Sequence, residues 1–235
     1  MNLFQTLTRF LFLTLSISQV ETANDQTRDY FVFLTTGKST QGIAADVIQQ
    51  KQVAHLDNFG RLAKLGSLTA AGPCVDPNKK TRGIVVVHAN SVNDAESKFA
   101  PDPFVSEGFM NAELHQYKTI AGKLQLILEV TSMEQSVIVI LSRGSKWTEK
   151  KPQDESIASK LADFAKKQFN EGKLGFAAQF NGQSNVETER IAVMIFRGEE
   201  IDPVKRALEG IDLVREELVG FQAFPQYLAK GALAE

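Results

Sequence analysis

The sequence carries the same pattern of segments twice, and this internal repeat limits the fold more than any other feature. Each copy begins with an apolar run that ends at a glycine, at residues 30–37 and 137–144. Runs of β-branched and aromatic residues bounded by turn residues predict buried strands. In both copies a polar loop follows, and then apolar residues at three- and four-residue spacings predict an amphipathic helix. A repeat of this length predicts two copies of one structural unit.

The remaining segments extend the correspondence between the copies. Gly66 and Gly172 follow the two predicted helices, where a glycine can adopt the left-handed conformation that ends a helix. A strand, a turn-rich segment, another strand, a short helix and a last strand then follow in each copy. The order β-α-β-β-α-β is the split βαβ, or ferredoxin-like, arrangement. We therefore predict an α+β protein with two ferredoxin-like units, at residues 28–120 and 134–230.

The last part of each unit aligns at a constant offset of 110 residues. This alignment pairs Asp102 with Asp212 and Gly108 with Leu218, so the aspartate occurs in both copies and the glycine in only one. Residues 119–133 join the two units. Their apolar run is so short that periodicity leaves a strand and a buried helical turn as open alternatives.

The first 23 residues differ in character from the rest of the chain. Arg9 precedes an apolar run at residues 10–17, which is too short for a bilayer span of about 20 apolar residues. A basic residue, a short apolar run and small residues after it are typical of a secretory signal peptide. A helix packed on the domain is the alternative. We predict that residues 1–23 are a signal peptide, that the protein is exported to the periplasm or the extracellular space, and that no membrane span remains after cleavage.

Composition limits the classes of function. The 26 Lys and Arg residues against 28 Asp and Glu residues give a net charge of −2, which lacks the basic footprint of nucleic-acid-binding proteins. The single cysteine, Cys74, excludes an intrachain disulfide and a thiolate metal cluster. The three histidines are His55, His88 and His115, and their spacing matches no zinc-ligand motif. We predict no metal site, no organic cofactor and no nucleic-acid partner.

Two residues of the first unit are candidates for chemistry. His55 precedes Phe59 by four positions, which places it on or beside the apolar face of its helix. Asp102 precedes Pro103 at the expected start of a short helix, where Asp is a preferred N-cap and Pro is favoured at the first helical position. From the residues alone, a buried structural histidine and a helix cap are the alternatives. A carboxylate has two oxygens, so a cap and a second contact are compatible.

Several motifs of the first unit resemble those of the YCII-related (YciI-like) family. They are Ala54-His55-Leu56, Ala71-Gly72-Pro73, and Asp102-Pro103-Phe104-Val105 followed by Gly108. The resemblance covers about residues 29–118 and implies the dimeric α+β barrel type, in which two ferredoxin-like units pair their sheets. The second unit has Lys160 or Leu161 where His55 would fall, so we interpret it as a degenerate copy. The two units are then expected to form a pseudo-dimer within one chain, with further homo-oligomers left open.

The resemblance also implies a function for His55 and Asp102, since a histidine and an aspartate at these places are suspected of catalysis in the family. A neutral imidazole can take a proton near pH 7, and a carboxylate beside it can fix its tautomer and stabilise the imidazolium. The implied activity is proton transfer on a small organic ligand, by a lyase, isomerase or dehalogenase-like enzyme. The alternative is a non-enzymatic module that binds a small ligand or another protein.

Overall fold

The structure is a computed structural model that describes residues 28–148 and 151–234, with the side chains of residues 151–153 left out. The segment predicted to be a signal peptide lies outside the described residues. None of the described helices is both long enough and apolar enough to cross a bilayer.

The first half of the described chain has four strands and three helices. They are β1 (Arg28–Thr36), α1 (Ala45–Lys64), β2 (Leu68–Pro73), β3 (Thr81–Ala89), α2 (Val92–Ser97), α3 (Pro103–Ser106) and β4 (Met110–Gly122). The second half has the same succession: β5 (Met133–Arg143), α4 (Lys151–Asn170), β6 (Leu174–Ser184), β7 (Arg190–Arg197), α5 (Ile201–Glu209), α6 (Asp212–Arg215) and β8 (Val219–Ala229). The glycines after α1 and α4, Gly66 and Gly172, have positive φ angles of 67° and 72°. The predicted glycine ends of both long helices are therefore confirmed.

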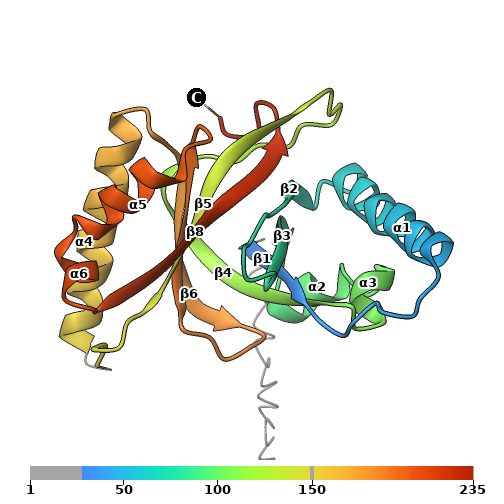
Figure 1. Cartoon of the computed structure of the whole chain (residues 1–235), viewed down its shortest axis with the longest axis horizontal. Coiled ribbons are helices and arrows are strands. Elements are labelled where there is room, and N and C mark those ends of the chain that lie inside the picture. The colour runs from blue at the N-terminus through green and yellow to red at the C-terminus, as the bar shows by residue number, and fades with distance from the viewer. Residues whose placement is uncertain (1–27, 149–150, 235) are drawn as a thin grey trace, which may run out of the picture.

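All eight strands form one antiparallel sheet in the order β2-β3-β1-β4-β6-β7-β5-β8. The halves meet where β4 pairs with β6, for example at Tyr117 opposite Phe180. The outer strands β2 and β8 also approach each other: the Val75 N–H donates to the Pro225 carbonyl at 2.8 Å, and Cys74 forms an isolated bridge with Gln226. The sheet therefore curls into a nearly closed barrel (Figure 1).

Gly72 lies at the seam between β2 and β8. A Cβ atom at this position would lie 1.8 Å from the carbonyl oxygen of Tyr227. Two non-bonded carbon and oxygen atoms cannot approach so closely, so the seam requires a residue without a side chain here.

The barrel interior is an apolar core with several aromatic rings. The rings of Phe31 and Phe176 stack with centroids 6.4 Å apart, and Phe180 packs beside them. Helices α4, α5 and α6 cover the outer face of the second half, whereas α1, α2 and α3 lie on the outer side of the first half (Figure 1). Each half thus has its own layer of apolar side chains between its helices and its strands, and the two halves share the apolar core of the barrel.

The segment between the halves forms neither the strand nor the buried helical turn that its sequence left open. Strand β4 continues to Gly122, and the residues from 123 to 132 then form no helix and no strand. Leu124 makes one isolated bridge with Leu233, and the Gln125 N–H donates to the Ala232 carbonyl at 2.9 Å. The C-terminal residues hold this segment in place as an ordered loop.

The sequence alignment of the last parts of the two halves is wrong by one residue. Asp102 is the N-cap of α3, but α6 begins at Asp212 and has Ile211 at its N-cap. The left-handed residue after each short helix agrees with this shift, because Gly108 (φ 77°) corresponds to Glu217 (φ 59°). Ile211 is therefore the counterpart of Asp102, and Asp212 does not cap its helix.

Candidate functional site

The structure brings His55 and Asp102 together, although they are 47 residues apart. His55 lies on α1 with 7% of its surface exposed, and Asp102 is completely buried at the start of α3. The Nδ1 atom of His55 lies 2.5 Å from the Oδ2 atom of Asp102. A buried carboxylate requires such a partner, because an unpaired charge in the interior is strongly unfavourable.

The two carboxylate oxygens of Asp102 have different partners. Oδ1 accepts a hydrogen bond from the Phe104 backbone N–H at 3.0 Å, which confirms the predicted N-cap. Pro103 occupies the first helical position, where its missing N–H leaves no donor unpaired. The cap fixes the carboxylate in space, so Oδ2 presents a defined acceptor to the imidazole of His55.

Two aromatic rings hold the imidazole of His55. The centroid of the Phe59 ring lies 4.4 Å from that of His55 at an interplanar angle of 62°, and the Phe104 ring lies 5.6 Å away at 81°. Phe59 is one turn along α1, as expected from its spacing. These edge contacts and the bond to Asp102 define the orientation of the ring.

This arrangement selects the tautomer of the neutral imidazole. An ionised carboxylate only accepts hydrogen bonds, so Nδ1 carries the proton and donates to Asp102. The lone pair of the neutral ring is then on Nε2. Within the described residues no hydrogen-bond partner is found for Nε2 of His55, and it is not among the fully buried polar atoms without a partner.

His55 faces a pocket of about 310 Å³ between α1 and the outer face of the first half of the sheet. Its polar lining residues are Gln52, His55 and Arg82, and it has no acidic lining residue. The remaining lining residues are Leu34, Leu56, Phe59, Ala71, Gly72, Pro73, Gly83, Ile84, Met110 and Met133. The pocket therefore offers the donors of Gln52 and Arg82 and the Nε2 lone pair of His55 within a mainly apolar wall.

Several lining residues were not singled out from the sequence, among them Gln52, Met110 and Met133. Gln52 precedes His55 by three positions on the same helix, so helical spacing could have identified it. Met110 begins the strand after Gly108, and its place in the pocket depends on the sheet register. Met133 belongs to β5 of the second half and reaches the pocket because the barrel closes. No local signal in the sequence could have indicated Met133.

The corresponding positions of the second half are apolar. Leu161 of α4 stands at the place of His55 and is 3% exposed, and Ile211 stands at the place of Asp102. Both pack in the layer between the helices and the sheet of that half. The same succession of elements therefore packs without a polar pair, so packing alone does not account for His55 and Asp102.

His88 makes different contacts at the end of β3. Its Nδ1 contacts Asp29, and its Nε2 lies 2.8 Å from the Thr69 hydroxyl. Both ring nitrogens are thus engaged, and the side chains of His88 and Asp29 are about two-fifths exposed. This group is a cross-strand network at the sheet surface.

His115 is buried in the barrel wall and stacks on Phe180, with centroids 4.6 Å apart and an angle of 24°. Its Nε2 atom is buried without a hydrogen-bond partner. Burial, together with the nearby positive charge of Arg190, lowers its pKa from 6.5 to about 4. His115 is therefore neutral at neutral pH.

Acid is expected to destabilise the protein through His115. An unfolded histidine has a pKa near 6.5, so between about pH 6.5 and 4 the unfolded chain binds a proton that the native state does not. This contribution to stability is complete above pH 6.5 and falls by at most about 3 kcal/mol as the pH drops to 4. In His115→Phe, which keeps a ring against Phe180, urea unfolding should show a smaller loss over this range. An unchanged pH dependence would contradict the assignment.

Burial, and to a smaller extent the charge of Asp76, raises the pKa of the Cys74 thiol, so Cys74 is a poor nucleophile. Among residues 28–148 and 151–234, no group of three His, Cys, Asp or Glu side chains is placed to hold a metal ion.

Comparison with known proteins identifies the fold. No protein-family model and no curated protein matches the chain. Solved structures do match, including a candidate monooxygenase from Fusobacterium nucleatum at a TM-score of 0.53 and 9% identity, over 87% of this chain and 93% of that one. The chain shares their fold, an α+β fold with an eight-stranded antiparallel sheet in a nearly closed barrel.

Two chlorite dismutase structures from Candidatus Nitrospira defluvii show the same similarity. A mutant enzyme matches at a TM-score of 0.53 and 11% identity, over 86% of this chain and 92% of that one. The enzyme in complex with imidazole matches at a TM-score of 0.54 and 10% identity, over 88% and 94%. At these identities the similarity extends to the fold, and the function must be argued from the site.

Proposed function

We propose that the protein is an enzyme that transfers a proton on a small organic substrate, with His55 as general base or acid and Asp102 as its orienting carboxylate. One observation carries this proposal: Nδ1 of His55 is bound to a fully buried carboxylate, while the same imidazole lines a pocket. This is the relation between base and orienting acid in a catalytic triad. The enzymes among the structural neighbours agree with catalysis on this fold by analogy only.

The proposed reaction follows from the different surroundings of the two imidazole nitrogens, Nδ1 and Nε2. The neutral Nε2 atom accepts a proton from a carbon of the substrate, and the ring becomes an imidazolium. The bond to Asp102 stabilises this cation, and the buried position of the pair strengthens the interaction. The imidazolium then returns the proton to another atom of the substrate, which gives isomerisation, or gives it to a leaving group that departs with the electrons of its bond as a double bond forms, which gives elimination.

Proton abstraction can be tested before the natural substrate is known. The protein is incubated in D₂O with a panel of small ketones, lactones and carboxylic acids, and loss of the signals from hydrogens next to the carbonyl is followed by NMR. We expect exchange with at least one compound, and its loss in His55→Gln. Exchange that is equal in both proteins would contradict the role of His55. Binding without any exchange would support the alternative, a non-enzymatic small-ligand-binding module.

We also propose that the two halves are copies of one ferredoxin-like unit and that the first is related to the YCII family. The strand order within each half supports the repeat, because β2-β3-β1-β4 and β6-β7-β5-β8 are the same order. The family motifs lie at the pocket: His55 and the Ala71-Gly72-Pro73 segment line it, and Asp102 contacts the imidazole of His55. Because β2 meets β8 within one chain, the barrel is expected to form in a monomer, which size-exclusion chromatography with light scattering can test.

We propose, from its sequence pattern, that residues 1–23 direct export. The full chain and a chain that begins at residue 24 are expressed in bacteria, and the cell fractions are separated. We expect the full chain in the periplasm or medium with a shortened N-terminus by mass spectrometry, and the shorter chain in the cytoplasm. An uncleaved full chain in the cytoplasm would contradict this proposal.

A further inference from the structure

A second pocket lies directly beside the one that His55 lines. It has a volume of about 230 Å³, and its lining is apolar apart from Thr69 and Gln125. Phe59 and Ala71 line both pockets. These two shared residues make the pockets neighbours within one space between α1 and the sheet.

The order of the lining residues shows that the two pockets follow one groove. Along α1, the first pocket is lined by Gln52, His55, Leu56 and Phe59, and the second by Phe59, Gly60 and Ala63. Along β2, which lies opposite, residues 71–73 line the first pocket and residues 68–71 the second. Helix and strand therefore flank both pockets in succession, and the ring of Phe59 stands at the boundary.

The loop between the halves covers the second pocket. Leu126, Ile127, Leu128 and Val130 line it from this loop. The loop is tied to the C-terminal residues, since the Gln125 side chain donates to the Gly231 carbonyl at 2.8 Å. The second pocket thus has a helix on one side, a strand on another and an ordered loop above it.

Large apolar side chains around this groove remain exposed to solvent. Leu56 and Met133, beside the first pocket, are 56% and 44% exposed, and Leu128 and Val130, above the second, are 73% and 54% exposed. Exposed apolar side chains that line adjoining pockets favour a ligand site, since large exposed apolar areas often mark one. An elongated apolar molecule in the groove would remove part of this surface from water.

We infer that the ligand of this groove is an elongated, mainly apolar molecule with one hydrogen-bond-accepting head, a carboxylate or a carbonyl. The head lies in the first pocket, where the Gln52 amide and the Arg82 guanidinium can donate and which has no acidic lining residue. The tail passes Phe59 and fills the second pocket. The position of the head at His55 rests on the proposed function, whereas the position of the tail rests on the apolar lining alone.

Linear carboxylates of increasing length test this inference by isothermal titration calorimetry. The affinity is expected to rise from butanoate through octanoate to dodecanoate, by about fourfold for each methylene that becomes buried, at a stoichiometry of one per chain. Equal affinities for the three acids would overturn the inference, as would binding of several dodecanoates per chain with no saturation.

The variant Gly60→Leu is designed to place an apolar side chain in the second pocket. Gly60 lines that pocket, and a Cβ atom there would have no other atom within 4 Å. Leucine also favours a helix more than glycine does, so the variant should fold. We expect dodecanoate affinity to fall to near that of butanoate, with butanoate affinity unchanged. Unchanged dodecanoate affinity would overturn the inference.

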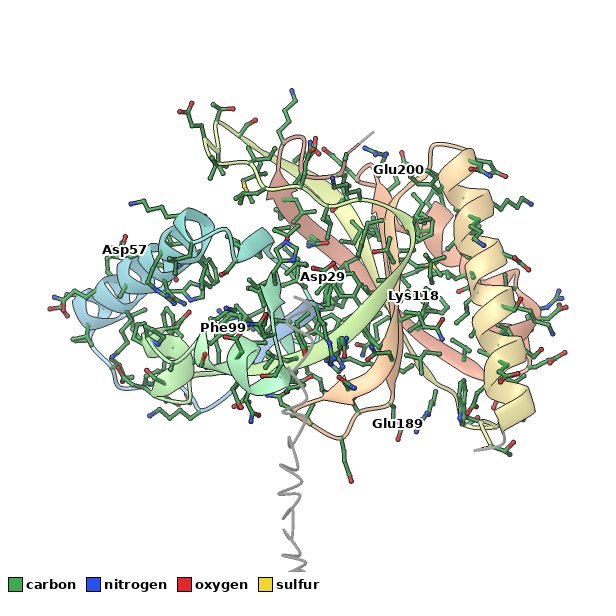
Figure 2. The ribbon with its side chains drawn as sticks, turned by 180° about the vertical axis from the view of Figure 1, so that it is seen from behind. Asp29, Asp57, Phe99, Lys118, Glu189 and Glu200 are labelled. Atoms are coloured by element: carbon green, nitrogen blue, oxygen red, sulfur yellow. The ribbon has the colours of Figure 1, made fainter. Side chains whose placement is uncertain are left out.

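A matched control adds the same side chain elsewhere on α1. Asp57, labelled in Figure 2, is exposed and lines neither pocket, so Asp57→Leu should leave all three affinities unchanged. In His55→Gln the dependence on chain length should persist, because the tail does not contact that residue. Chain-length dependence without proton exchange would uphold the groove and reject the proposed reaction, and the converse result would reject the groove alone.

Discussion

Replacing His55 with glutamine is expected to slow proton exchange on the responsive substrate by roughly 10²–10⁴-fold, the usual contribution of a positioned general acid or base. Glutamine has a similar length and can still donate to the Asp102 carboxylate, so that this buried group keeps a partner. It cannot accept a proton near pH 7. The rate is measured by NMR in D₂O, and circular dichroism shows whether the variant keeps the wild-type fold. A rate within a few-fold of the wild type in a folded variant would reject His55 as the base.

Asp102→Asn separates the helix cap from the contact with His55. The amide oxygen can still accept from the Phe104 N–H, so α3 should remain capped. The amide group can donate toward Nδ1, which favours a proton on Nε2 and removes the basic lone pair from the pocket. We therefore expect slow exchange with an unfolding midpoint close to the wild type. Slow exchange together with a large loss of stability would instead indicate a structural role for the carboxylate.

Gly72→Ala is expected to destabilise the protein by about 3 kcal/mol or more, at or above the upper end of the usual cost of overpacking. The new Cβ atom would lie 1.8 Å from the Tyr227 carbonyl oxygen, and both atoms belong to paired backbone that cannot rotate away. Strands β2 and β8 must then separate, which weakens the nearby hydrogen bond from the Val75 N–H to the Pro225 carbonyl. Urea unfolding followed by circular dichroism measures the change.

Gly60→Ala is the matched control for this substitution. It makes the same change within α1, where a Cβ atom meets nothing within 4 Å. Alanine in a helix is favoured over glycine by roughly 0.5–1 kcal/mol, so this variant should be slightly more stable than the wild type. If both variants unfolded at the wild-type midpoint, the close approach of β2 and β8 would not be required for the fold.

The order of elements was predictable because its signals are local. Apolar runs that end at glycine predicted the strands, and Gly66 and Gly172 marked the ends of the long helices. The loop between the halves was not predictable, since its contacts are with Leu233 and other C-terminal residues about a hundred positions away. Its apolar residues line a pocket or are exposed to solvent, so their spacing has neither the period of a helix nor that of a strand.

The candidate site was predictable only in part. The position of His55 on its helix and the cap at Asp102 follow from local rules, and both agree with the structure. The alignment of Asp102 with Asp212 was wrong because it matched two aspartates that differ by one position in their helices. Asp102 is the N-cap of α3, whereas Asp212 is the first residue of α6. Only backbone geometry, such as the left-handed Glu217, reveals the true counterpart.

The seam between β2 and β8 has a consequence for how such a protein can change over time. In a barrel built from two identical chains, every substitution is expressed twice, so a change that suits one side must be tolerated on the other. Here one chain supplies both sides, and each position mutates independently. The chain can therefore hold an ionisable pair, His55 and Asp102, in the first half and an apolar pair, Leu161 and Ile211, in the second. Asymmetry of this kind is open to a covalently joined barrel and closed to a symmetric homodimer.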